Sequence, residues 1–148
     1  MLNILELIVG FTVDGVPVGK ARPRFARRGN FVTAYTPAKT KTYEEQVSLV
    51  SRIAMKTANK TICPSPVQIN MEIFVPIPKS WSKIKRTRAL NGEEYPTTKP
   101  DADNVAKGVL DALNGIVFED DKQVVGLFIV KRYSDRPRVD VRVYEVAE

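Results

Sequence analysis

The stretch Lys99–Gln123 reads KPDADNVAKGVLDALNGIVFEDDKQ. Val105, Val109 and Leu113 recur at helical spacing, and Asn114-Gly115 is a typical stop signal, so the stretch predicts a helix over about 102–113. It also concentrates carboxylates in a chain of formal net charge +6. Crowded carboxylates repel one another unless a cation neutralises them. The segment therefore predicts a cation site, built from some of Asp101, Asp103, Asp111, Glu119, Asp120 and Asp121.

The sequence on either side predicts the rest of the fold. Apolar and alternating patterns indicate strands at 4–13, 31–35, 67–75, 123–133 and 139–146, and helical spacing indicates helices at 37–58 and 80–90. Thr36 and Pro37 are expected as N-cap and first residue of the first helix. Because 123–133 is apolar on both faces, we expect a central strand there, paired as a hairpin with 139–146. Helices and strands do not alternate regularly, so residues 1–148 are predicted to form a single α+β domain, a mixed sheet packed by helices.

Composition limits the chemistry of the chain. It contains no histidine and one cysteine, which excludes Ser-His-Asp and Cys-His catalysis, histidine-ligated zinc and an internal disulfide. No apolar run is long enough to cross a bilayer, so we expect a cytoplasmic protein with no membrane partner. Its positive charge favours an anionic partner such as nucleic acid.

The spacing of the acids favours a site for a hard divalent cation. Pro100 is expected to keep the entry to the helix extended, so that Asp101 and Asp103 project to one side. Oxygen ligands with a nearby lysine, Lys107, suit Mg²⁺ or Mn²⁺ and phosphoryl transfer. The later acids, Glu119 to Asp121, are expected to return to this pair. An ordinary helix cap, with Asp103 and Lys107 as an i,i+4 ion pair, remains the alternative.

Two stretches carry basic residues and no acid. The first lies between Gly15 and Tyr43, and the second covers residues 73–92. Beside a site that cleaves phosphodiesters, such residues are expected to contact phosphates rather than read bases. Phe25 and Phe31 lie among them, with base stacking and core packing both open. The residues predicted to bind DNA here are Lys20, Arg22, Arg24, Arg27 and Arg28.

Three ordered segments resemble the RusA-type Holliday junction resolvases. They are KPDADNVAK through DALNG to DDKQ, the upstream GVPVGKARPRF at 15–25, and TPAKTKTYE at 36–44. The resemblance implies a homodimeric, Mg²⁺-dependent endonuclease that cuts four-way DNA junctions by paired incisions in recombination and repair. Such proteins are common in phages and prophages.

Carried over by position, the resemblance assigns roles to individual residues. Asp101, Asp103 and Asp121 match the family's essential acids and metal ligands, and Lys107 matches its catalytic lysine. Whether Asp120 or Asp121 is the main ligand stays open. Some members have an arginine directly before the first aspartate; this chain has Pro100 there, so that DNA contact passes to Lys99. Asn104 and Asp120 are expected to lie next to the metal ligands and to help hold them in place.

Two other functions remain open at this point. A non-catalytic nucleic-acid-binding module would use the same acids only for capping and ion pairs, and it would bind a junction without nicking it. A nuclease that prefers flaps or forks would share the cleavage chemistry and differ in substrate. A homodimer suits a four-way junction because two strands related by a near two-fold axis need two equivalent sites.

Overall fold

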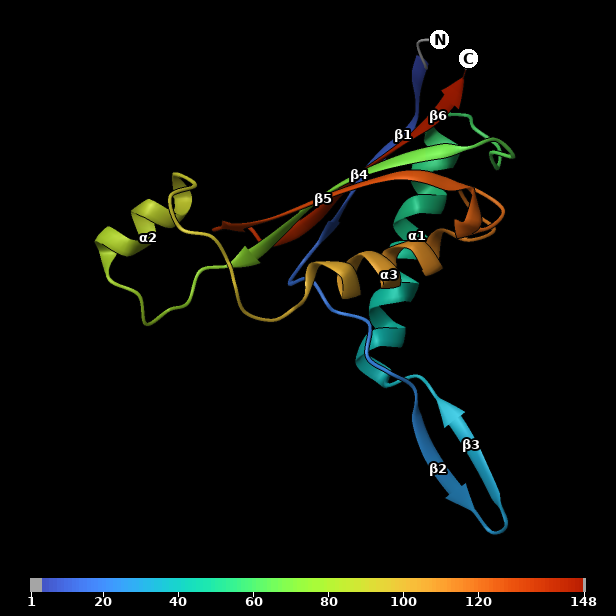
Figure 1. Ribbon diagram of the computed structural model, residues 1–148, viewed down its shortest axis with the longest axis horizontal. Helices are drawn as coiled ribbons and strands as arrows, with labels where there is room; N and C mark the ends of the chain where they lie inside the picture. Colours follow the sequence, from blue (N-terminus) through green and yellow to red (C-terminus); the bar gives the residue numbers. More distant parts are fainter. Residues whose placement is uncertain (1–3, 148) are drawn as a thin grey trace.

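The central element of the computed structural model, which describes residues 4–147, is a mixed four-stranded sheet of order β1-β6-β4-β5 (Figure 1). Strand β6 pairs antiparallel with both β1 and β4, and β5 pairs parallel with β4. The expected α+β architecture with a mixed sheet is confirmed. Met1–Asn3 and Glu148, which the single-domain prediction includes, lie outside the described residues. The strands are β1 (Ile4–Asp14), β4 (Val67–Pro76), β5 (Val124–Ser134) and β6 (Arg138–Ala147).

One face of the sheet packs against two helices, α1 (Ala38–Thr57) and α3 (Ala102–Leu113) (Figure 1). The alternation of β4 decides which of its side chains enter this core: every second residue, from Val67 to Val75, is buried. Helix α3 contributes Val105, Val109 and Leu113, all fully buried. The predicted bounds of α3 are confirmed, and its apolar stripe turns the opposite, polar face outward.

Strand β5 differs from the prediction. It is an edge strand rather than a central one, and it does not pair with β6, because β4 lies between them. Its apolar residues are therefore only partly covered: Val125 is 65% exposed and Phe128 59% exposed. Apolar side chains on both faces of a strand are consistent with either position in the sheet, so the pattern could not distinguish them.

A second sheet consists of β2 (Arg24–Arg28) and β3 (Phe31–Tyr35), an antiparallel hairpin that projects away from the rest of the chain (Figure 1). The sequence predicted β3 but not β2. Alternation predicts strands through burial of one face, and β2 buries neither face. Its signal was the turn itself, since Gly29-Asn30 between two β-prone runs is typical of a two-residue hairpin.

The remaining elements are short. Helix α2 (Lys83–Leu90) is capped by Ser82, whose hydroxyl accepts a hydrogen bond from the backbone N–H of Lys85. The 3-10 turn η1 (Asp121–Gln123) leads into β5. Helix α1 begins one residue later than expected: Pro37 holds the N-cap position and its side chain makes no capping bond. No helix within residues 4–147 is both long and apolar enough to cross a membrane.

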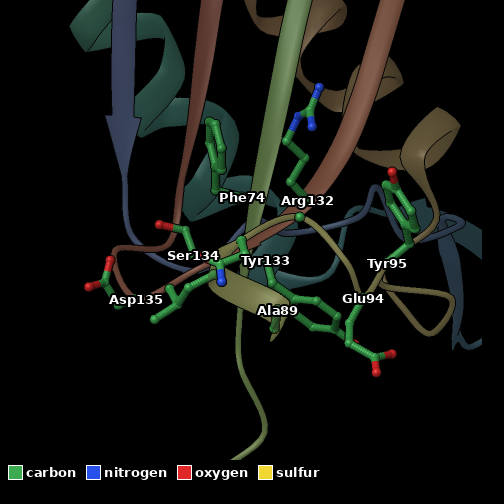
Figure 2. Close-up of a pocket in the computed structure, with 11 residues that line it drawn as sticks. Phe74, Ala89, Glu94, Tyr95, Arg132, Tyr133, Ser134 and Asp135 are labelled. Carbon is green, nitrogen blue, oxygen red and sulfur yellow. The ribbon is translucent and has the colours of Figure 1, made fainter. Parts of the chain in front are cut away.

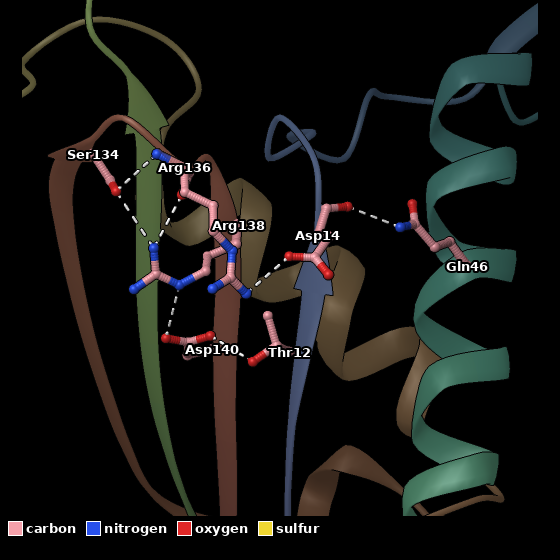
Figure 3. A network of polar contacts seen from close by, with 7 residues as sticks. All are labelled: Thr12, Asp14, Gln46, Ser134, Arg136, Arg138 and Asp140. Carbon is pink, nitrogen blue, oxygen red and sulfur yellow. Dashed lines mark hydrogen bonds and ion pairs between the residues drawn. The ribbon is translucent and has the colours of Figure 1, made fainter.

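A polar network fixes the point where the chain leaves β1 (Figure 3). Arg136 pairs with the Asp14 carboxylate at 3.1 Å, and the Gln46 amide of α1 donates to the Asp14 carbonyl at 2.9 Å. The backbone N–H of Gly15 donates to the Pro137 carbonyl. The segment that follows, residues 15–23, is thereby directed over α3 toward the acidic stretch.

Candidate functional site

The two acids at the start of α3 are both exposed. Asp101 is the N-cap residue, in extended conformation, and its side chain makes no capping hydrogen bond. Asp103 lies in the first helical turn, where its Oδ1 accepts a hydrogen bond from the Asn104 N–H at 3.0 Å. Only Asp101 is extended, so the two do not share a side through strand-like alternation as expected. They share the helix N-terminus, which favours negative charge.

This helix start is held from two sides. The ammonium group of Lys131, on β5, donates to the carbonyls of Thr98 at 2.8 Å and Pro100 at 3.0 Å. The backbone N–H of Lys20 donates to the Asn104 carbonyl at 3.0 Å, which ties segment 15–23 to α3. A small hollow of about 210 Å³ lies between these segments, lined by Gly19, Lys20, Lys99, Pro100, Asp101 and Asn104.

The second acidic group is organised by Gln123. Its side-chain oxygen accepts from the N–H groups of Glu119 and Asp120 at 2.8 and 3.0 Å. Its side-chain nitrogen donates to the carbonyls of Cys63 and Ser65, both at 2.9 Å. Sequence reasoning did not single out Gln123, because its role depends on a loop distant in the chain.

The two adjacent aspartates of this group have different partners. The Asp120 carboxylate accepts a hydrogen bond from the backbone N–H of Lys122, which is the main cause of a lowered pKa at Asp120. The Oδ2 of Asp121 instead lies 3.5 Å from the Nζ of Lys107. Of the two, Asp121 is the acid that meets the polar face of α3.

Lys107 belongs to a row of alternating charges. Its Nζ lies 3.3 Å from Oδ1 of Asp111, one helical turn further on. The other oxygen of Asp111 is hydrogen-bonded to the ammonium group of Lys20, which also lies 3.1 Å from Oε1 of Glu44 on α1. The hydrogen bonds to Asp111 are the first cause of raised pKa values at both lysines, which therefore stay protonated at neutral pH. We call this row, Glu44, Lys20, Asp111, Lys107 and Asp121, the charge row.

The acids match a hard cation in chemistry but do not form one compact cage. Among residues 4–147, no three acidic or sulfur side chains gather closely enough to hold a metal ion. The expected convergence of Asp121 on Asp101 and Asp103 is therefore not seen within one chain. Mg²⁺ often binds through one or two carboxylates, with waters and substrate phosphates completing its shell. The pair Asp101 and Asp103 fits that donor set; the metal-binding roles stay predictions.

The predicted DNA contacts fall into two classes. Arg22, Arg24, Arg27 and Arg28 are exposed, and none forms an ion pair with an acid in the described part of the chain. Lys99 is also exposed and lies beside Asp101 at the small hollow. Lys20 differs, because its ammonium group already binds two carboxylates. Its place in the run of basic residues suggested a free cation, and the fold gives it acidic partners.

The aromatic residues of the hairpin are not core residues. Phe25 is 71% exposed and Phe31 77% exposed, on opposite faces of the hairpin. Phe31 directly follows the turn, and its cross-strand partner is Arg28. The core-packing alternative for these two side chains is wrong.

A separate hollow of about 370 Å³ lies between α2 and the ends of β4 and β5 (Figure 2). Two tyrosines, Tyr95 and Tyr133, lie around it with two acids, Glu94 and Asp135, and one cation, Arg132. None of the predicted site residues lines it. We therefore place the candidate site at the polar face of α3.

Comparisons with known proteins point to the same place in the chain. The family model described as endodeoxyribonuclease RusA matches residues 14–144, which include both acidic groups, Lys107 and the hairpin. A Bacillus subtilis (strain 168) protein, described as uncharacterized protein YqaN, is 44% identical over 141 residues, covering 94% of this chain and 97% of the relative. The resemblance predicted from the sequence is confirmed.

Proposed function

Because this chain belongs to the RusA endodeoxyribonuclease family, we propose that it is a Mg²⁺-dependent endonuclease that resolves four-way DNA junctions by paired phosphodiester hydrolysis. Membership by itself implies a resolvase-like endonuclease. The observation that carries the proposal is the contact between Lys107 and Asp121 at 3.5 Å. It brings Asp121 of the second acidic group against the helix that begins at the first group, although the two groups are separated in sequence by a helix and a turn.

The proposed chemistry assigns a task to each group. Asp101 and Asp103 would hold the ion at the open N-terminus of α3, where both side chains are exposed to a substrate. When bound, Mg²⁺ polarises the scissile phosphate and makes the attacking water more acidic. Lys107, protonated and 57% exposed, stabilises the negative charge that develops on the phosphate in the transition state.

Asp121 is proposed as the third acid of the set. Its side chain is 30% exposed and faces Lys107, so it can orient that ammonium group from the side of β5. Asp120 is proposed to support it, because its own carboxylate caps the turn η1.

The hairpin is proposed as the main contact with DNA. Its arginines form no ion pair with an acid among residues 4–147, so their charge is available to phosphates, which supply affinity without reading sequence. Phe31, next to the turn, is placed to stack on a base that the branch point leaves unstacked. An isolated two-stranded hairpin is marginally stable in water, so a surface that covers it would also order it.

A homodimer is part of the proposal. Two symmetric cuts in a four-way junction need two equivalent sites, and a two-fold axis supplies them. The edge strand β5, with its exposed Val125 and Phe128, is a surface that a second copy would cover.

The deciding experiment is a cleavage assay with and without Mg²⁺ on labelled four-way, flap and linear duplex DNA. The proposal expects paired nicks near the branch of the four-way substrate, only when Mg²⁺ is present. Binding without any nick would favour the non-catalytic module. Faster cutting of flaps than of four-way junctions would favour the flap or fork nuclease.

A further inference from the structure

The charge row brings together three separate parts of the fold around one carboxylate. Asp111 of α3 binds the ammonium group of Lys20, from segment 15–23, and that group is shared with Glu44 of α1. The three side chains are between 23% and 28% exposed, so water screens them less than it screens the hairpin arginines. These contacts therefore define the position of the Asp111 carboxylate.

The two oxygens of the Asp111 carboxylate face different lysines, and Oδ1 is the one that faces Lys107. Oδ2 binds Lys20, and Oδ1 lies 3.3 Å from the Nζ of Lys107. Lysine has a long flexible side chain and loses much rotamer freedom when it is held in one place. Lys107 is held on one side by Asp111 and on the other by Asp121, at 3.3 and 3.5 Å.

We propose that Lys20 and Asp111 are positioning residues that aim the ammonium group of Lys107 at the scissile phosphate. The proposal rests on the proposed function for the identity of the reaction, and it changes the role of Lys20 from DNA contact to support of Lys107. Glu44 takes part by holding Lys20 against Asp111.

The geometry also explains how Lys20 reaches α3. Its Cβ passes the helix at Gly108, where an added methyl group would lie 3.7 Å from it, an ordinary van der Waals contact. Gly108→Ala therefore adds bulk beside the charge row without removing a charge or forcing a shift. It is the matched control for a change that is only steric.

The test compares Lys20→Met with Arg27→Met, since each removes one cation from the same basic run. Junction affinity is measured without divalent ions, and the cleavage rate of the bound junction is measured in single turnover with Mg²⁺. Lys20→Met is expected to slow cleavage by about tenfold to a hundredfold, because small displacements of a catalytic group have large effects, with affinity unchanged. Arg27→Met is expected to lower affinity and leave the rate of the bound complex unchanged.

Conservative variants distinguish a loss of Lys107 positioning from a simple loss of folding. Lys20→Arg keeps a cation between Asp111 and Glu44 and is expected to recover most of the rate. Asp111→Asn keeps the shape and removes the charge, and it is expected to behave like Lys20→Met. Gly108→Ala is expected to match the unmodified protein, and thermal unfolding of every variant is recorded alongside.

A readout that does not depend on cleavage separates this inference from the proposed function. NMR relaxation of the lysine ammonium groups reports how ordered the Lys107 side chain is. We expect the Lys107 ammonium group to become more mobile in Lys20→Met and Asp111→Asn. If the protein cuts no DNA but Lys107 loses order in these variants, the nuclease proposal fails, while the inference that Lys20 and Asp111 hold Lys107 in place stands. A fall in affinity with an unchanged rate for Lys20→Met, or an unchanged Lys107 signal, would overturn the positioning role.

Discussion

The hairpin and the charge row take their cations from one run of basic residues, and the fold treats them in opposite ways. Arg24, Arg27 and Arg28 project on β2 with no acidic partner in the described part of the chain, whereas Lys20, a few residues earlier, is held between two carboxylates. In the sequence all four are equivalent basic residues in an acid-free stretch. The comparison shows that a cation serves binding or positioning according to the acids that other elements bring to it.

The largest expected effect comes from the acids at the start of α3. Asp103→Asn keeps the size of the side chain and removes the charge that a hard cation requires. We expect Mg²⁺-dependent cleavage to fall below detection while junction affinity is retained, as measured by gel shift and single-turnover assays. Cleavage at the normal rate would show that Asp103 has no part in the reaction.

The next effect concerns Lys107, the outermost cation of the charge row. Lys107→Ala removes charge stabilisation in the transition state, and loss of one such group typically slows chemistry roughly a hundredfold to a thousandfold. Junction affinity should change much less, because the hairpin is proposed as the main contact with DNA. Equal losses of rate and affinity would show that Lys107 binds DNA, as the hairpin arginines are proposed to do, and would contradict the distinction between the hairpin and the charge row.

Phe31 tests whether the hairpin contacts bases as well as phosphates. Stacking of one base on an aromatic ring is worth about 1–3 kcal/mol. Phe31→Ala should therefore weaken binding to a four-way junction and leave linear duplex binding nearly unchanged, while Phe31→Trp should restore it. A fluorescent base analogue at the branch point reports unstacking directly. Val32→Ala, which truncates a neighbouring exposed apolar residue, is the control.

The smallest effect is expected for the hairpin arginines taken as phosphate contacts. The double variant Arg27→Ala with Arg28→Ala should weaken binding to junction and duplex alike. The slope of log affinity against log salt should fall by about 2, one for each lost phosphate contact. The same measurement on Lys20→Met should leave the slope unchanged, and a lowered slope there would return Lys20 to the DNA-binding group.

Local patterns predicted much of the fold and of the candidate site. The bounds of α3, the alternation of β4 and the acids at both ends of the family signature follow from residues that are close in sequence. The errors have a common cause. The edge position of β5, the strand β2 and the N-cap at Pro37 depend on which neighbours cover a segment or cap its end.

The amino-acid sequence alone determined the helix that carries Asp101, Asp103 and Lys107, and it determined the family. It did so because spacing along one helix and the order of short motifs are properties of the chain itself. Only the tertiary structure decided that Lys20 is paired and that Asp121 meets Lys107. The same holds for two absences within residues 4–147: the hairpin arginines have no acidic partner there, and no three acids gather there. Those outcomes depend on distances between segments far apart in sequence, and charge patterning along the chain does not contain them.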